Sequence, residues 1–321
     1  MPTWQTGKRK KVNNKTDYKK GLTGILCCEL IWGMLPIYWQ SLRPIDSFVI
    51  IMYRVVLMAL FCYIVTAFRM KTPKVFGPMF AGRKAFLTYF AAGIVIMFNW
   101  SLYIWAVNAN YVIQTAMGYY LEPLIVCLFG VVLYKEKANK WKVTAFLFAC
   151  AGIAVMIIGY RQAPLIAIGL AVSFAIYAAI KKSVFLDPLQ SMLYETILLM
   201  PLCVIGAIYM EINGNGAFGN AAGYKIALLA LAGVCTAAPL GLFSFAANKM
   251  PLITIGMLSY LSPSLSLILG IFILKEDFDA VQFSAFAIIW VGLVFFTHGE
   301  ISDYRRSRNA LDPGQDNSRT D

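Results

Sequence analysis

Long apolar segments separated by short polar ones account for most of this chain. Ten of them are long enough to cross a membrane as helices, at residues 22–41, 47–68, 85–107, 112–134, 141–160, 163–180, 190–210, 225–246, 252–274 and 280–298. An apolar run of about 20 residues with few charges is typical of a transmembrane helix. Because the runs are continuous and do not alternate in polarity, the pattern predicts an all-α integral membrane protein rather than a barrel.

The composition supports this fold class. Hydrophobic residues make up 60% of the chain and charged residues 14%, and the mean hydropathy is +0.67. A soluble domain carries about a quarter charged residues. The apolar runs therefore do not belong to a large water-soluble core.

The chain also contains an internal repeat with a shift of 140 positions. Residues 102–159 and 242–299 share 15 identities in 58 gapless positions, including Pro123 with Pro263. The shift covers five predicted helices, and because five is odd the two halves must be inverted relative to each other. We therefore expect two inverted five-helix repeats between two polar tails, with the basic tail at 1–20, the repeats at 21–160 and 161–298, and the second tail at 299–321.

The basic residues indicate the orientation of these helices. With the N-terminus in the cytosol, the cytosolic segments hold 23 of the 28 Lys and Arg, the outer loops hold four, and Arg54 lies within a span. This asymmetry follows the positive-inside rule, so both termini are expected in the cytosol. The net charge of +12 thus reflects membrane topology rather than binding to nucleic acid, and the basic N-terminal tail favours anionic lipid.

Four ionisable side chains fall within the predicted spans: Glu29, Arg54, Glu122 and Glu195. A charge at the bilayer centre costs at least ~2.5 kcal/mol, so such a residue usually faces a partner or a wet cavity. Arg54 is expected to pair with Glu195 or with Glu122, and the sequence leaves both pairings open. We interpret Glu29, Arg54 and Glu195 as gating or pairing residues, with a static ion pair as the structural alternative.

Glu122 is the strongest candidate for a functional acid, because Pro123 follows it directly. Proline removes a backbone donor and clashes with the carbonyl four residues earlier, so helix breaks are expected at Pro36, Pro123 and Pro263. A carbonyl freed in this way within a membrane needs protein or cavity water. A single acid in such a polar setting can bind a cation or take up a proton.

Polar and aromatic side chains near these prolines extend the predicted substrate site. They share helix faces or flank the prolines: Trp32, Asn99, Tyr103, Tyr119, Glu122, Tyr260 and Ser262. The structural alternatives are an interfacial aromatic belt for the Trp and Tyr residues and hydrogen bonds back to their own helix for the serines.

The sequence contains no recognisable motif for ATP binding, metal binding or enzymatic catalysis. There is no Walker loop for ATP, and the one histidine, His298, comes at the end of the last span. The seven cysteines all lie in apolar runs and are expected to be free thiols. We therefore expect no cofactor, no metal site and no enzymatic activity.

Three segments carry a resemblance to a known family. KKGLTGILCCELIWGMLPIYWQ, NWSLYIWAVNANYVIQTAMGYYLEPL and TAAPLGLFSFAANKMPLITIGMLSYLSPSL are similar to the RarD branch of the EamA family, in the drug/metabolite transporter superfamily. The resemblance covers residues 19–298. It implies ten helices in two EamA repeats, cytosolic termini, and export or exchange of small organic molecules. The chain departs from the family at Glu122, where the resemblance implies asparagine.

The pattern and the resemblance together predict a secondary-active permease or exporter of small organic metabolites or drugs in the cell membrane. Inverted repeats favour alternating access around a site near mid-membrane, driven by a solute gradient or by proton exchange. A lipid-headgroup carrier or flippase of the same fold and a non-transporting membrane sensor or scaffold stay open as alternatives. The sequence does not identify the substrate or the oligomeric state.

Overall fold

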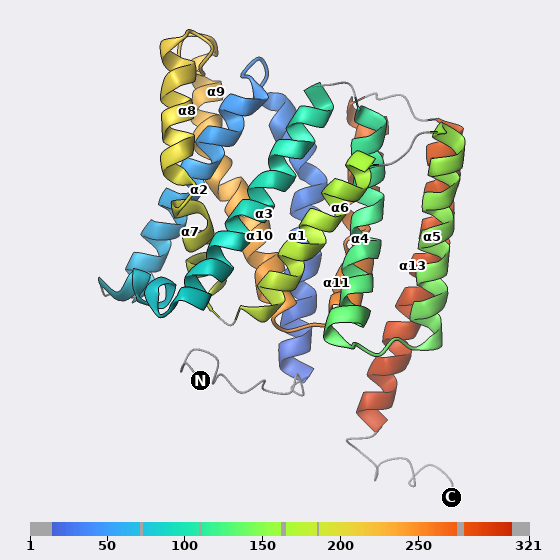
Figure 1. Cartoon of the computed structure of the whole chain (residues 1–321). Helices are drawn as coiled ribbons and strands as arrows, with labels where there is room; N and C mark the ends of the chain where they lie inside the picture. Colours follow the sequence, from blue (N-terminus) through green and yellow to red (C-terminus); the bar gives the residue numbers. More distant parts are fainter. Residues whose placement is uncertain are drawn as a thin grey trace, which may run out of the picture.

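The protein is a bundle of long helices, as the computed structural model of the chain shows (Figure 1). The structure describes residues 15–70, 73–108, 111–161, 165–184, 186–274 and 279–309. The helical elements are α1 Lys15–Ser41, α2 Ser47–Met70, the 3₁₀ helix η2 Pro73–Phe80, α3 Arg83–Asn108, α4 Val112–Tyr134, α5 Lys140–Tyr160, α6 Leu165–Ser183, α7 Pro188–Ile197, α8 Met200–Ile212, α9 Gly223–Ala230, α10 Ala232–Ala247, α11 Leu252–Leu258, α12 Leu261–Leu269, the π-helical turn η3 Gly270–Leu274 and α13 Ala280–Asn309.

The helices confirm the predicted all-α membrane fold. Within the described residues, nine helical segments are long and apolar enough to cross a membrane, and α7 with α8 makes a tenth if the bent pair is one span. The eighth predicted span consists of α9 and α10, and the ninth of α11, α12 and η3. The basic N-terminal tail up to residue 14 lies outside the described residues. So does the loop at 275–278, where Lys275-Glu276 matches Lys135-Glu136 at the repeat shift of 140.

Besides the eighth span, which is interrupted at Leu231 between α9 and α10, two spans are interrupted just ahead of a proline. The α7–α8 pair bends by 57° at Leu198 and Leu199, next to Pro201. The ninth span is interrupted at Ser259 and Tyr260, ahead of Pro263. A proline withholds the hydrogen bond to the carbonyl four residues earlier, so the interruption falls before the proline rather than at it.

The expected breaks at Pro36 and Pro123 are not found. α1 continues through Pro36 and α4 continues through Pro123 without interruption. The carbonyl that loses its backbone donor to Pro123 is that of Tyr119, four residues earlier. The hydroxyl of Tyr260 donates a 3.0 Å hydrogen bond to the next carbonyl, that of Tyr120. A donor from a neighbouring helix beside a proline helps a membrane helix to continue through it.

Reciprocal contacts between α5 and α13 show that the two halves are inverted. A Cβ at Gly152 would lie 2.9 Å from the carbonyl oxygen of Ala285, and a Cβ at Gly292 would lie 3.0 Å from that of Ala145. These four residues form two repeat-related pairs at the shift of 140. Contacts that exchange in this way require an antiparallel crossing about a two-fold axis, and Figure 1 shows the two helices side by side at one edge of the bundle.

The helix α13 is longer than expected. It continues to Asn309, past the predicted end at residue 298. Lys142 of α5 forms ion pairs of 2.5 Å with Glu300 and 3.0 Å with Asp303, and these pairs hold the added turns against the neighbouring helix. Part of the predicted polar tail is therefore an ordered helix end.

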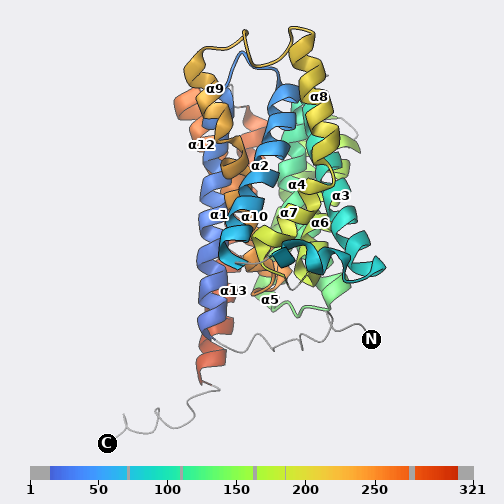
Figure 2. The ribbon, with the colours of Figure 1, turned by 90° about the vertical axis from the view of Figure 1, so that its left-hand side faces the viewer.

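The two largest of four apolar clusters among the described residues each contain helices from both halves. The larger core is formed mainly by α1, α2, α3, α6, α7 and α10. The smaller core is formed mainly by α4, α5, α11 and α13. α4, α6 and α11 contribute side chains to both cores, so these three helices link the two. Figure 2 shows that α1 begins and α13 ends at the same end of the bundle.

Candidate functional site

Glu122 is an interior carboxyl group with no partner of its own. It lies in the middle of α4 and is partly accessible, and it makes no hydrogen bond or ion pair with any residue that the structure describes. An acid in this setting is available to a ligand, a cation or a proton.

Two tyrosines lie near Glu122. Tyr103 of α3 and Tyr119 of α4 contact each other edge to face, with ring centroids 5.7 Å apart. Tyr119 keeps 47% of its surface accessible. The two rings carry hydroxyl groups beside apolar faces, an arrangement suited to an amphipathic molecule.

Arg54 lies between two tryptophan rings. Its guanidinium carbon is 4.2 Å from the ring centroid of Trp100 and 5.5 Å from that of Trp39. The buried Nε has no hydrogen-bond partner, and Arg54 has no ion pair within the described chain. Both expected pairings, with Glu195 and with Glu122, are therefore wrong. Cation–π contact replaces an ion pair here, because the π faces attract the cation without adding a second charge.

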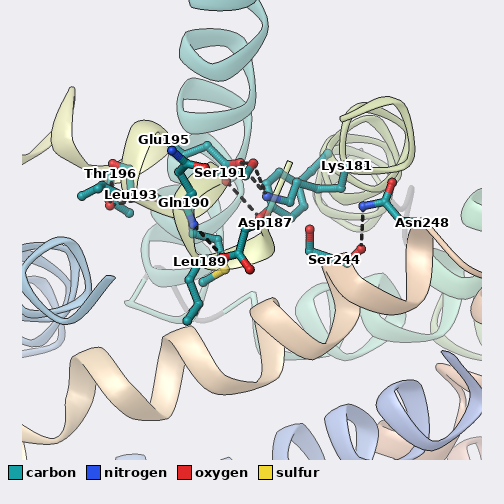
Figure 3. Close-up of polar contacts among 12 residues, drawn as sticks. Lys181, Asp187, Leu189, Gln190, Ser191, Leu193, Glu195, Thr196, Ser244 and Asn248 are labelled. Carbon is teal, nitrogen blue, oxygen red and sulfur yellow. Dashed lines mark hydrogen bonds and ion pairs between the residues drawn. The ribbon is translucent and has the colours of Figure 1, made fainter. Parts of the chain in front are cut away.

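Glu195 pairs instead with Lys181 (Figure 3). The Lys181 ammonium lies 2.7 Å from Glu195 Oε1, and both side chains are almost fully buried. Ser191 accepts a 2.7 Å bond from Lys181 and donates a 2.8 Å bond to Glu195, while Tyr177 donates a 3.1 Å bond to the other carboxylate oxygen. This network satisfies both charges, so Glu195 is a structural residue that joins α6 to α7.

The other predicted lining residues have structural contacts. Asn99 donates 2.9 Å hydrogen bonds to the Leu170 carbonyl and to Ser173, which join α3 to α6. Trp32 packs against the rings of Phe174 and Phe243. Tyr260 is 1% exposed and donates to the Tyr120 carbonyl, as described above. Ser262 is half-buried near the start of α12.

Glu29 lies against the interruption in the ninth span. It is completely buried in α1, and its Oε1 lies 2.9 Å from the hydroxyl of Ser259. Its other oxygen, Oε2, is buried without a hydrogen-bond partner. Within the described chain Glu29 therefore contacts a helix interruption rather than a basic residue.

Glu136 joins α4 to the start of α11, a role that the sequence pattern did not predict. Its carboxylate accepts 2.9 Å hydrogen bonds from the backbone N–H groups of Leu252 and Ile253 at the start of α11. Lys182 lies 2.8 Å from the same carboxylate and donates to the Met250 carbonyl. The sequence signal for Glu136 was the Lys-Glu pair that recurs in both halves. Its hydrogen-bond partner Leu252 is 116 residues away in sequence, so only the tertiary fold brings the two together.

The described chain contains no group of three or more His, Cys, Asp or Glu side chains placed to hold a metal ion. Its seven cysteines are free thiols. The interior therefore offers isolated charged and aromatic groups rather than a metal centre.

These features define a multi-pass integral membrane protein made of two inverted repeats, with unpaired charged groups in its interior. The chain belongs to the EamA-like transporter family, whose model matches residues 19–158 and again 162–297. It is thus a membrane transporter of the drug/metabolite transporter type.

Relatives and a solved structure agree with this assignment. The uncharacterized transporter YojE of Bacillus subtilis is 33% identical over 296 residues, which cover 91% of this chain and 98% of YojE. Protein RarD of Streptomyces exfoliatus is 31% identical over 292 residues, covering 88% and 89%. A solved crystal structure covers 87% of this chain and 96% of its own, with a TM-score of 0.64 at 18% identity, and so shares the fold.

Proposed function

We propose that this protein is a secondary-active carrier of small polar or amphipathic organic molecules, and that it works by alternating access between its inverted halves. The observation that carries the proposal is Glu122, an interior carboxyl group without a partner in the described chain. Holding such a group inside a membrane is costly unless water, a ligand or a proton satisfies it. A protein that served only as a scaffold would gain nothing from that cost.

The surroundings of Glu122 support a binding role. Tyr119 and Glu122 both keep accessible surface in the middle of α4, one helical turn apart, so one small molecule can contact both side chains. Arg54 adds an interior cation, held against the rings of Trp100 and Trp39, so the interior holds charges of both signs as well as the two tyrosines. Opposite charges beside aromatic rings suit a small molecule that has both polar and apolar parts.

The orientation of the bundle is part of the proposal. The termini would face the cytosol, where the ion pairs of the described chain also gather, at the ends of α5, α6 and α13. The repeats at 21–160 and 161–298 would be the units that exchange conformations, and the basic tail would contact anionic lipid. A fluorescent protein fused after Asp321 should fluoresce, and a phosphatase at that position should be inactive. An active phosphatase fusion would contradict this orientation.

Transport by the purified protein in proteoliposomes tests the function. Candidate substrates come from metabolites that differ between a deletion strain and its parent. Uptake of such a molecule should need the intact protein, and Glu122→Gln should abolish uptake or remove its dependence on the pH gradient, because the amide cannot carry charge or take up a proton.

Asn220→Ala serves as the control variant, because Asn220 hydrogen-bonds only to nearby backbone groups in the loop after α8. It should transport like the wild type. If Glu122→Gln leaves both transport and its pH dependence unchanged, Glu122 has no part in the function.

A further inference from the structure

Glu29 is the most deeply buried acid of the interior, and the proposed function does not yet use it. Its side chain has no accessible surface. One oxygen lies 2.9 Å from Ser259 Oγ, and the other is buried without a hydrogen-bond partner. An ionised carboxylate accepts hydrogen bonds at both oxygens, so this setting supplies too few donors for the charged form.

Within the described residues, no basic side chain forms an ion pair with Glu29. The helices with the most extensive contacts on α1 are α10, α12 and α11, and none of the three contains Lys, Arg or His. α6 also touches α1, through Phe174 against Trp32, but its lysines Lys181 and Lys182 are paired with Glu195 and Glu136. The titratable groups that face Glu29 are Cys28 on its own helix and Glu122 of α4, close enough for its charge to act on Glu29. An unpaired charge in a dry interior is normally removed by protonation.

The hydrogen bonds of Ser259 agree with a protonated Glu29. Ser259 Oγ also lies 3.1 Å from the carbonyl oxygen of Ile255, and a hydroxyl has only one hydrogen to donate. If that hydrogen goes to Ile255, the contact with Glu29 is completed by a carboxylic acid that donates to Ser259 Oγ. All three groups then form a continuous chain of hydrogen bonds.

This chain of hydrogen bonds lies where α1 packs closely on an interrupted helix. A Cβ at Gly33 would lie 2.8 Å from the side chain of Leu265, and Ser266 donates a 3.1 Å bond to the Gly33 carbonyl. Glu29 itself has no accessible surface, so water does not reach its carboxyl group while this packing holds. Loss of the proton to water would therefore require α1 to separate from α11 and α12.

We propose that Glu29 is a proton-binding site whose protonated form holds α1 against the interruption at Ser259, and whose deprotonation releases this contact. The role in coupling rests on the proposed transport function. The proton goes to water that enters as the helices separate, and it returns when they close. Proton binding by Glu29 is thus coupled to the movement of the interrupted helix.

Infrared spectroscopy of the purified protein in lipid nanodiscs tests the protonation without any substrate. The wild type should show the carbonyl stretching band of a protonated carboxyl group at neutral pH, and Glu29→Gln should lose that intensity. Ser259→Ala should shift the band without removing it. Glu136→Gln is the matched control and should leave the band unchanged, because Glu136 accepts two backbone hydrogen bonds and pairs with Lys182. A band unaffected by Glu29→Gln would overturn the proposal.

Hydrogen–deuterium exchange tests the link to movement. As the pH rises, peptides from residues 252–269 should exchange faster in the wild type than in Glu29→Gln, after correction for the intrinsic pH dependence of exchange. Equal exchange in the two proteins, or failure of the neutral glutamine variant to fold, would refute the proposal. Neither measurement needs a substrate. If the protein transported nothing, the proposed function would be wrong, but the infrared and exchange results would still test the proton site.

Discussion

At the scale of single residues, the interior charges differ according to whether a partner satisfies them. Glu195 and Lys181 form a buried pair with hydrogen bonds from Ser191 and Tyr177, whereas Glu122 and Arg54 have no ionic partner in the described chain. A satisfied pair holds helices together, and a charge without a partner is free to bind.

The buried pair makes a prediction about stability. Lys181→Met leaves the Glu195 carboxylate buried and uncompensated, so the free energy of unfolding should fall by about 3–5 kcal/mol. The double variant Lys181→Met/Glu195→Leu should recover much of that loss, because it removes both charges. Chemical denaturation in detergent measures these differences.

An exposed ion pair provides the control. Arg69 and Asp187 lie 3.5 Å apart with side chains 64% and 40% exposed, so Arg69→Met should stay within about 1 kcal/mol of the wild type. A Lys181→Met protein as stable as Arg69→Met would show that the buried pair does not hold α6 to α7.

The sequence identified the interior acids but not their partners. Glu29, Glu122 and Glu195 stand out because a charge within an apolar run is costly. Lys181, by contrast, resembles one of several loop lysines that follow a span, and only the packing of α6 on α7 buries it. Partners that come from other helices depend on tertiary structure, which one-dimensional patterns do not contain.

At the scale of helices, the apolar pattern predicted the spans well but not their interruptions. All ten predicted runs correspond to helical segments in the described chain, because burial in a membrane requires long apolar helices whatever their neighbours. Whether a proline interrupts a helix depends on neighbouring groups. Pro123 has a nearby donor in Tyr260, whereas the span containing Pro263 is interrupted four residues earlier.

The contact between α5 and α13 makes a second prediction. A Cβ at Gly152 would lie 2.7 Å from Ile289 and 2.9 Å from the Ala285 carbonyl, so Gly152→Ala should cost about 1–3 kcal/mol of stability by overpacking. Thermal unfolding monitored by circular dichroism in detergent checks this. Gly223→Ala is the matched control, because its Cβ would meet no atom within 4 Å, and it should unfold like the wild type. Equal losses in the two variants would show that the close contact is not responsible.

At the scale of the whole molecule, the inverted repeat links the fold to the proposed function. Sequence similarity at a shift of 140 predicted two antiparallel halves, and the reciprocal glycine contacts of α5 and α13 bear this out. The two larger apolar cores each draw on both halves, so movement of one half against the other would rearrange the packing in both cores. Glu122 lies on α4, where such movement would change its exposure.

The central claim is that the interior around Glu122 and Tyr119 is open to water rather than to lipid. Labelling by a charged, membrane-impermeant thiol reagent tests it most directly, with single cysteines in a cysteine-free background of the protein in vesicles. Tyr119→Cys should react, and Leu147→Cys on α5, where the native side chain is 61% exposed on an apolar surface, should not. If both positions remain unlabelled, or both react at the same rate, the side chains around Glu122 do not line an aqueous path and the account is wrong.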